Sequence, residues 1–372
     1  MGEEMKAWER RIHRVSPYTP GEQPKMENIV KLNTNENPYP PAPAVQEAIR
    51  SFDVQQLRKY PDPAVAELSS AIADTYQVPK DQVFVGVGSD DVLAMSFLTF
   101  FHSDDPVLFP DITYSFYDVW AQEFEIPFET VPLKEDFTID PLDYIPRERG
   151  GRREGPIGGI VIPNPNAPTG IDANVSAIRK IVENNPDVVV IIDEAYVDFG
   201  ATSVLPMINT FDNLMVVQTF SKSRSLAGSR IGYGFGSQKL IKYLSDVKYS
   251  FNSYTMDAIT MKVGVASLSD PDYFASCCQK IVATREEAKQ RLRALGFHFP
   301  DSRTNFIFAR HESVPAKDLF TALREAGIIV RHFNQPRIDN YLRITIGTDQ
   351  QMQRLYTFLE EYLQQAGWRA GE

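Results

Sequence analysis

Cysteine, positive charge and long apolar runs are scarce in this chain, and each shortage excludes a class of protein. The only cysteines, Cys277 and Cys278, are adjacent, so a disulfide framework cannot form and a reducing compartment fits. The net charge of −11 argues against nucleic-acid partners, which require a basic surface. No apolar run approaches the length of a membrane span, and residues 1–11 lack an apolar leader. The sequence therefore predicts a cytoplasmic protein without nucleic-acid or membrane partners.

The chain has 372 residues, of which 43% are hydrophobic, and this length predicts a large core and two domains. Short apolar runs alternate with helical stretches, and these runs end near Gly86, Pro110, Pro163, Asp193 and Ser221. The alternation predicts an α/β fold with a mostly parallel central sheet, flanked by helices, and a site along the carboxyl edge of its strands. The helical run 272–295 is expected to separate a large domain, residues 46–275, from a smaller α+β domain, residues 276–372, which is joined by an N-terminal arm, residues 1–45.

Two of these strand ends carry an acid and an amine. One strand ends in Asp193, and the next run is followed by polar groups in quick succession: Thr219, Ser221, Lys222 and, a turn or two later, Arg230. A desolvated lysine is a nucleophile, hydroxyls beside an arginine suit a bound phosphate, and an ionised aspartate can keep a pyridine nitrogen protonated. Together these groups indicate a pyridoxal phosphate Schiff base. A surface lysine in a serine-rich loop and an Asp-Glu pair capping a strand are the simpler alternatives.

A second phosphate signal lies in the segment 82–101. An apolar strand meets Gly86 and Gly88, and Ser89 and Asp90 then open a helix. Glycines let the backbone approach an anion, and a helix N-terminus presents free N–H groups. The third glycine of a dinucleotide fingerprint is missing, so the favoured interpretation is a monophosphate cradle. A tight turn with an N-cap is the alternative.

These motifs resemble those of fold-type I pyridoxal phosphate aminotransferases, and within that group the chain is similar to the histidinol-phosphate aminotransferases over essentially its whole length. The resemblance implies pyridoxal 5′-phosphate as cofactor, no metal, and a homodimer with a shared active site. It implies that Lys222 is the catalytic lysine, that Asp193 protonates the cofactor ring, that Tyr114 stacks on it, and that Tyr60 reaches the phosphate in the other subunit. The implied cofactor contacts are Gly88, Ser89, Asp90, Tyr114, Asn166, Asp193, Tyr196, Thr219, Ser221, Lys222, Arg230 and Tyr60.

The chain departs from the family pattern in the segment Asn164–Gly170, which reads NPNAPTG. In the family an asparagine donates to the 3-oxygen of the cofactor, and here Ala167 takes its place. The sequence offers Asn166 as the substitute, with Asn164 behind it and Tyr196 as a further donor to the same oxygen. Which of these side chains replaces the asparagine stays open at this point.

Arginines of the C-terminal part are candidate substrate ligands. Arg343 alternates with apolar residues on a predicted strand, and Arg331 precedes it. An arginine in a cleft can hold a carboxylate or a phosphate through two parallel hydrogen bonds. Arg337 is a weaker candidate, and solvated arginines are the alternative. The resemblance adds Tyr18, from an arm that closes over the substrate, and Asn35, from the arm that leads into the first helix.

The resemblance implies transamination of L-histidinol phosphate with 2-oxoglutarate, which gives imidazole-acetol phosphate and L-glutamate in histidine biosynthesis. An aromatic amino acid aminotransferase is the second interpretation. A phosphothreonine-type decarboxylase, which would also use two anion sites, is the third. A non-enzymatic binding protein or regulator of the same fold belongs to a different class, and the presence of both Asp193 and Lys222 argues against it.

Overall fold

A seven-stranded sheet forms the centre of the computed structural model, which describes residues 6–25 and 28–368. Its strands, in spatial order, are β2 (Val83–Gly86), β8 (Gly232–Phe235), β7 (Leu214–Thr219), β6 (Val190–Asp193), β5 (Gly159–Pro163), β3 (Val107–Pro110) and β4 (Phe128–Val131). Among these strands β8 alone runs against its neighbours, so the carboxyl ends of the others meet at one edge. The predicted α/β fold with a mostly parallel sheet is confirmed.

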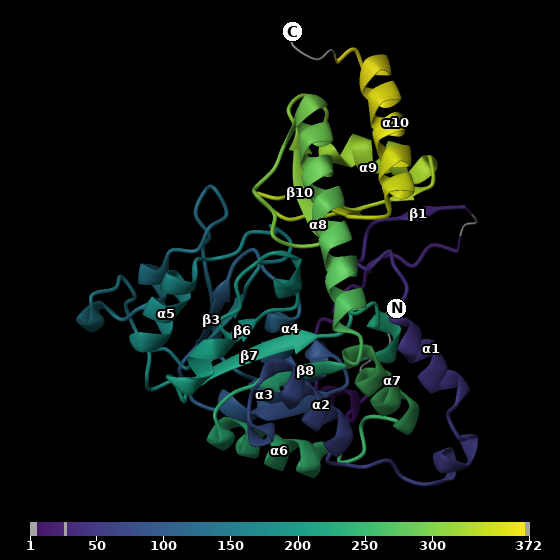
Figure 1. The fold of residues 1–372 in the computed structure, drawn as a ribbon. Coiled ribbons are helices and arrows are strands. Elements are labelled where there is room, and N and C mark those ends of the chain that lie inside the picture. The colour runs from purple at the N-terminus through teal and green to yellow at the C-terminus, as the bar shows by residue number, and fades with distance from the viewer. Residues whose placement is uncertain (1–5, 26–27, 369–372) are drawn as a thin grey trace.

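Helices cover both faces of this sheet (Figure 1). One face packs against α3 (Ser89–Phe100), α4 (Tyr117–Glu123) and α6 (Gln238–Phe251). The other packs against α1 (Pro43–Arg50), α2 (Ala66–Tyr76), α5 (Val175–Glu183) and α7 (Ala258–Leu268). In β6, Ile191 faces the first set of helices, whereas Val190 and Ile192 face the second. This is the period of two that an extended strand imposes on its side chains.

A smaller part of the molecule is built on an antiparallel sheet. Its strands, in spatial order, are β12 (Arg331–His332), β13 (Leu342–Thr345), β10 (Phe306–His311) and β9 (Phe297–His298). Helices α9 (Ala316–Glu325) and α10 (Asp349–Gln365) share its core. Strand β1 (Val30–Lys31) pairs in parallel with β11 (Ile328–Ile329). The N-terminal arm therefore contributes a strand to this part. Short 3-10 turns occupy Glu9–Arg11, Val54–Arg58, Lys80–Gln82, Pro141–Tyr144, Arg147–Arg149, Val197–Phe199, Leu205–Asn209 and Ala227–Ser229.

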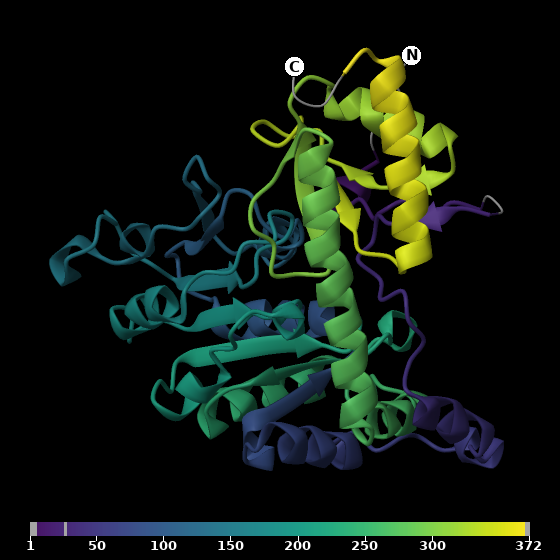
Figure 2. The same ribbon diagram turned by 45° about the horizontal axis from the view of Figure 1, so that its top comes forward.

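Helix α8 (Pro271–Ala294) connects the two parts. Figures 1 and 2 show it rising from beside α7 into the smaller part, where α10 lies alongside it. The predicted domain division after residue 275 falls within its first two turns and stays a prediction. No helix in the described part of the chain is long and apolar enough to cross a membrane. The expectation about the leader rests partly on residues 1–5, which lie outside the described residues.

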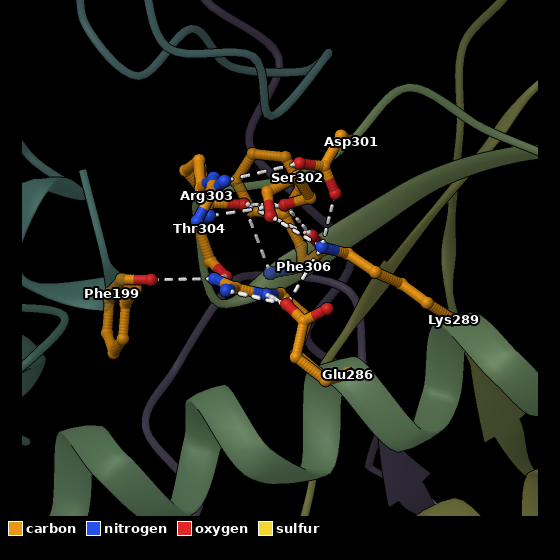
Figure 3. Close-up of polar contacts among 9 residues, drawn as sticks. Phe199, Glu286, Lys289, Asp301, Ser302, Arg303, Thr304 and Phe306 are labelled. Carbon is orange, nitrogen blue, oxygen red and sulfur yellow. Dashed lines mark hydrogen bonds and ion pairs between the residues drawn. The ribbon is translucent and has the colours of Figure 1, made fainter.

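Polar contacts from α8 hold the two parts together (Figure 3). The Arg285 side chain is 1% exposed, and its Nη1 donates to the carbonyl oxygen of Phe199, 2.7 Å away, and to that of Thr304, 2.9 Å away. Phe199 ends the turn that follows β6, whereas Thr304 precedes β10. Arg285 and the buried Lys289 also share the carboxylate of Glu286, each at 2.8 Å. The segment after β6 is thereby fixed to the segment that leads into β10 of the smaller sheet.

Candidate active site

Lys222 lies in the turn that follows β7. The strand ends at Thr219, so the lysine stands beyond the strand end where the sequence predicted it, and it is half-buried. Its Nζ donates to the backbone carbonyl oxygen of Thr34 at 3.2 Å and lies 5.8 Å from the centre of the Tyr196 ring. The amine therefore faces a cleft between the large sheet and the N-terminal arm.

Asp193 is the last residue of β6 and is buried. The hydroxyl of Tyr117 donates to its Oδ2 at 2.9 Å, and the backbone N–H of Ala195 donates to its Oδ1 at 3.2 Å. Burial raises the pKa of Asp193 to about 6, against the lowering effect of these two bonds and of the charge on Lys222. A cation beside this carboxylate would offset the cost of burying it.

One cavity brings together most of the predicted cofactor contacts. Its walls come from the carboxyl ends of β5, β6 and β7, from the start of α3 and from the loop before β8. The lining residues are Ser89, Asp90, Tyr114, Pro163, Pro165, Ala167, Asp193, Ala195, Tyr196, Thr219, Ser221, Lys222, Ala227 and Arg230. The amine of Lys222 and the carboxylate of Asp193 therefore border the same space, as the sequence predicted.

A cradle for an anion occupies one end of this cavity. The guanidinium of Arg230 donates to Asp90 at 2.9 Å and to the hydroxyl of Ser221 at 3.3 Å. Gly88 precedes α3 with a φ of +90°, and a Cβ atom there would collide with the Arg230 guanidinium. Because the Asp90 carboxylate already pairs with Arg230 and with the Tyr114 hydroxyl at 2.8 Å, Asp90 can offer an anion its backbone N–H at the helix N-terminus.

A second cavity adjoins the first and holds the predicted substrate contacts. Both cavities are lined by Tyr114, Ala167, Tyr196 and Lys222. The second is also lined by Tyr18, Gly21, Asn33, Thr34, Asn35, Thr113, Ser115, Pro168, Arg331, Phe333 and Arg343. The second cavity therefore brings four of the predicted substrate contacts to the side chain of Lys222: Tyr18, Asn35, Arg331 and Arg343.

Two arginines lie side by side in this second cavity. Arg331 of β12 and Arg343 of β13 are partners in the strand register. Arg343 donates to the carbonyl oxygen of Asn33 at 3.0 Å, and burial together with the neighbouring charge of Arg331 lowers its pKa. Within the described residues, no ion pair joins either arginine to an acidic side chain. Two neighbouring cations without an acidic partner favour an anionic ligand.

Three predicted contacts lie apart from this arrangement. The amide of Asn166 lines a different cavity and donates to the carbonyl oxygen of Ile112, 3.0 Å away. The amide of Asn164 bonds the backbone of Ala173. Tyr60 is 83% exposed, packs against the Tyr254 ring at 4.8 Å and lines neither cavity. The structure thus does not bring Asn166 or Asn164 to the lysine, and the role of Tyr60 in a second subunit stays a prediction.

Arg337, the weaker candidate, has a local role instead. It donates to Asp111 at 2.9 Å and to the carbonyl oxygens of Leu133 and Lys134. It lines neither of the two cavities. A salt bridge and two backbone carbonyls satisfy its guanidinium, which is therefore not available to a substrate.

Two contacts of the site were not predicted. Tyr117 is fully buried, and its hydroxyl donates to the carboxylate of Asp193. A buried tyrosine hydroxyl usually finds a polar partner, and this signal was available in the sequence. Thr34 contacts Lys222 through its backbone carbonyl oxygen, which no residue type reveals.

Comparison with known proteins agrees with this geometry. Residues 27–359 match the family model described as "Aminotransferase class I and II". The chain belongs to this aminotransferase family. This aminotransferase is 50% identical over 357 residues to histidinol-phosphate aminotransferase of Lactococcus lactis subsp. cremoris, a match that covers 96% of this chain and 98% of the relative. It is 49% identical over 364 residues to the histidinol-phosphate aminotransferase of Acinetobacter baylyi, a match that covers 97% of this chain and 98% of the relative.

Solved structures share the fold of this aminotransferase. Histidinol-phosphate aminotransferase of Sinorhizobium meliloti in complex with pyridoxal-5′-phosphate superposes with a TM-score of 0.78 at 23% identity, over 90% of this chain and 91% of that one. L-threonine-O-3-phosphate decarboxylase of Porphyromonas gingivalis gives a TM-score of 0.76 at 21% identity, over 90% of this chain and 100% of that one. The fold-type I expectation is confirmed, and the cofactor is pyridoxal 5′-phosphate. The residues present fit this group, because an anion cradle, a lysine amine and a buried carboxylate border one cavity.

Proposed function

We propose that this aminotransferase transfers the amino group of L-histidinol phosphate to 2-oxoglutarate, giving imidazole-acetol phosphate and L-glutamate in histidine biosynthesis. Relatives at about 50% identity over nearly the whole chain carry the name of that enzyme. The structural observation that supports it most directly is a pair of arginines beside the Lys222 amine, Arg331 and Arg343, which no acidic side chain among the described residues neutralises. A phosphate monoester carries a charge of about −1.5 to −2 near neutral pH, which one arginine would leave partly unpaired.

The protein side chains of the first cavity have separate tasks. When bound, pyridoxal 5′-phosphate supplies an aldehyde for the amino group and a ring that accepts electrons from the α-carbon of the donor. Lys222 would hold the cofactor through its amine and would act as the base that accepts the proton of the donor α-carbon. Asp193 keeps the ring nitrogen protonated, and the Tyr117 hydroxyl fixes the orientation of its carboxylate. Arg230, Ser221 and the start of α3 hold the phosphate.

The arginine pair explains how two different acids are bound in turn. The phosphate of the donor and the distal carboxylate of 2-oxoglutarate each present two oxygens that can accept parallel hydrogen bonds from a guanidinium group. Arg343 is held in place by the carbonyl oxygen of Asn33, so its orientation is set before either acid arrives. Tyr18 stacks on Phe116 at 4.0 Å and closes the cavity from the N-terminal arm.

We also propose that the active protein is a cytoplasmic homodimer. The exposed rings of Tyr60 and Tyr254, 83% and 49% accessible, support a second subunit on this face, because large aromatic side chains are enriched at interfaces. Tyr60 would then complete the phosphate cradle of the partner. Sedimentation of the protein, with Tyr60→Phe assayed for cofactor affinity, tests both statements.

The substrate assignment is tested by following the visible absorbance of the cofactor while candidate donors are added. Histidinol phosphate should convert it to the amino form without release of carbon dioxide. Conversion by phenylalanine alone would identify an aromatic aminotransferase, and release of carbon dioxide from phosphothreonine a decarboxylase. Lys222→Ala should abolish turnover, and an active variant would refute the assignment.

A variant of the arginine pair tests the recognition of the phosphate. Arg331→Met should raise the KM for histidinol phosphate roughly 10–100-fold, the value of one charge-assisted hydrogen bond. Arg310→Met removes an arginine from the exposed side of β10 and should leave KM unchanged. Equal effects of the two substitutions would contradict the role of Arg331.

A further inference from the structure

Asn35 occupies an unusual position between the N-terminal arm, the smaller sheet and the active site. It is 1% exposed, and its φ of 57° is left-handed. Its backbone carbonyl oxygen accepts from the Asn305 side chain at 2.9 Å, and its side-chain Nδ2 donates to the hydroxyl oxygen of Tyr196, also at 2.9 Å. A backbone held in this sparsely populated region points to a local function.

The orientation of the Asn35 amide follows from the hydrogen bonds of Thr345. The backbone N–H of Asn35 donates to Thr345 Oγ1 at 3.1 Å. That hydroxyl therefore directs its own proton to a different acceptor, and Oδ1 of Asn35 lies 3.1 Å away. The amide oxygen is thus paired with Thr345, which leaves the amide nitrogen as a donor to Tyr196.

The same reasoning fixes the direction of the Tyr196 proton. The phenolic oxygen accepts the bond from Asn35, so the hydroxyl hydrogen is free to be donated to another group. Among the described residues, this hydroxyl donates a hydrogen bond to none. Tyr196 lines both cavities together with Lys222 and Ala167, and its ring is packed edge-on against Phe306 at 5.1 Å. The hydrogen bond from Asn35 and the packing on Phe306 fix the position of the Tyr196 side chain. Its hydroxyl can therefore donate a hydrogen bond at the boundary of the two cavities.

Ala167 explains why such a donor is needed. Its methyl group borders both cavities and offers no hydrogen bond, and the amide of the adjacent Asn166 donates to the Ile112 carbonyl oxygen instead. We propose that Asn35 is a positioning residue, which acts through Tyr196 to direct a hydrogen bond to the phenolic oxygen of the cofactor ring. An amide from the N-terminal arm thereby takes over a task that the strand-end segment 164–170 leaves unfilled.

The test is a pH titration of the visible absorbance of the bound cofactor, with no substrate present. A hydrogen bond to an ionised oxygen favours its ionised form, so Asn35→Ala should raise the midpoint by roughly 1–2 pH units. Tyr196→Phe should raise it by a similar amount, and the double variant should shift no further than Tyr196→Phe alone. The charged or titratable groups around the Tyr196 hydroxyl are unchanged in these variants: Lys222, Arg343, Tyr114 and Tyr117.

Two further variants separate this role from a structural one. Asn185→Ala removes a buried asparagine that lines neither cavity and donates to the carbonyl oxygen of Tyr144, and it should leave the midpoint unchanged. Ala167→Asn, introduced into Asn35→Ala, should restore the midpoint toward the original value. An unchanged midpoint in Asn35→Ala, additive shifts in the double variant, or no restoration by Ala167→Asn would each overturn the proposal.

A milder variant serves if Asn35→Ala does not fold. Thr345→Val keeps all side chains that line the two cavities and removes only the hydroxyl that orients the Asn35 amide. It should shift the midpoint in the same direction by a smaller amount. A midpoint equal to that of the unaltered protein would contradict the proposed path. Because no substrate enters this experiment, its failure is distinguishable from a wrong assignment of the donor.

Discussion

Replacing Asp193 with asparagine should stabilise the cofactor-free protein and weaken its binding of the cofactor. The pKa of Asp193 rises from 3.8 to about 6 on folding because the carboxyl is buried. A carboxyl whose pKa is raised makes folding less favourable wherever it is ionised, so the cost is present above about pH 6 and disappears as the pH falls toward 3.8. The shift corresponds to roughly 3 kcal/mol at pH 8 and to about 0.5 kcal/mol at pH 4.

The substitution also removes a hydrogen bond, which reduces the gain in the free energy of unfolding. The two carboxylate oxygens accept from Tyr117 and from the backbone of Ala195, whereas asparagine has one acceptor oxygen, so about 1 kcal/mol is lost. The expected net effect on the free energy of unfolding is therefore about +2 kcal/mol at pH 8 and no gain at pH 4. Without the charge beside the ring nitrogen, cofactor affinity should fall roughly 10–100-fold.

Urea unfolding of the cofactor-free protein at the two pH values, followed by tryptophan fluorescence, measures the stability, and a cofactor titration measures the affinity. Asp136→Asn is the control, because bonds from Thr138 lower the pKa of this exposed carboxyl and the effect at pH 8 should have the opposite sign. A variant at position 193 that is less stable than the original protein at pH 8 would refute the reasoning.

Two further predictions concern Arg285, which links the two parts of the molecule, and Gly88, which lies in the anion cradle. Arg285→Met should lower the free energy of unfolding of the loaded enzyme by about 3–5 kcal/mol, because buried acceptors lose a charged donor; a loss below about 1 kcal/mol in urea unfolding would contradict this. Gly88→Ala should weaken cofactor binding about tenfold or more, because its φ is +90° and the new Cβ would collide with Arg230. Gly228→Ala, where an added Cβ meets nothing within 4 Å, should leave the cofactor titration unchanged.

Local patterns were enough to predict the large sheet and most of the polar residues at the carboxyl ends of its strands. The β-branched run before Asp193 specifies a strand, and the glycines before Ser89 specify a turn that opens a helix; both elements lie where they were expected. Strand β7 continues through Thr219, beyond the apolar run. Its end is set by pairing with β8, which the run itself does not contain.

Contacts between distant segments could not be predicted from local patterns. The Asn166 amide is directed by the carbonyl oxygen of Ile112, 54 positions away, and the Asn35 amide by a hydroxyl 310 positions away. A single sequence carries no record of which distant groups meet. The same limit applies to Arg285, whose acceptors lie on two different segments.

The pairing of β1 with β11 determines when the N-terminal arm can fold during synthesis of the chain. Val30 lies opposite Ile328, so 298 further residues must be added before the first strand meets its partner. At about 5–20 residues per second, the N-terminal arm waits roughly 15–60 s on the ribosome with its backbone donors and acceptors unpaired. During that interval the arm, which supplies Thr34 and Asn35 to the active site, is available to proteases and chaperones, and the site closes only when synthesis is nearly finished.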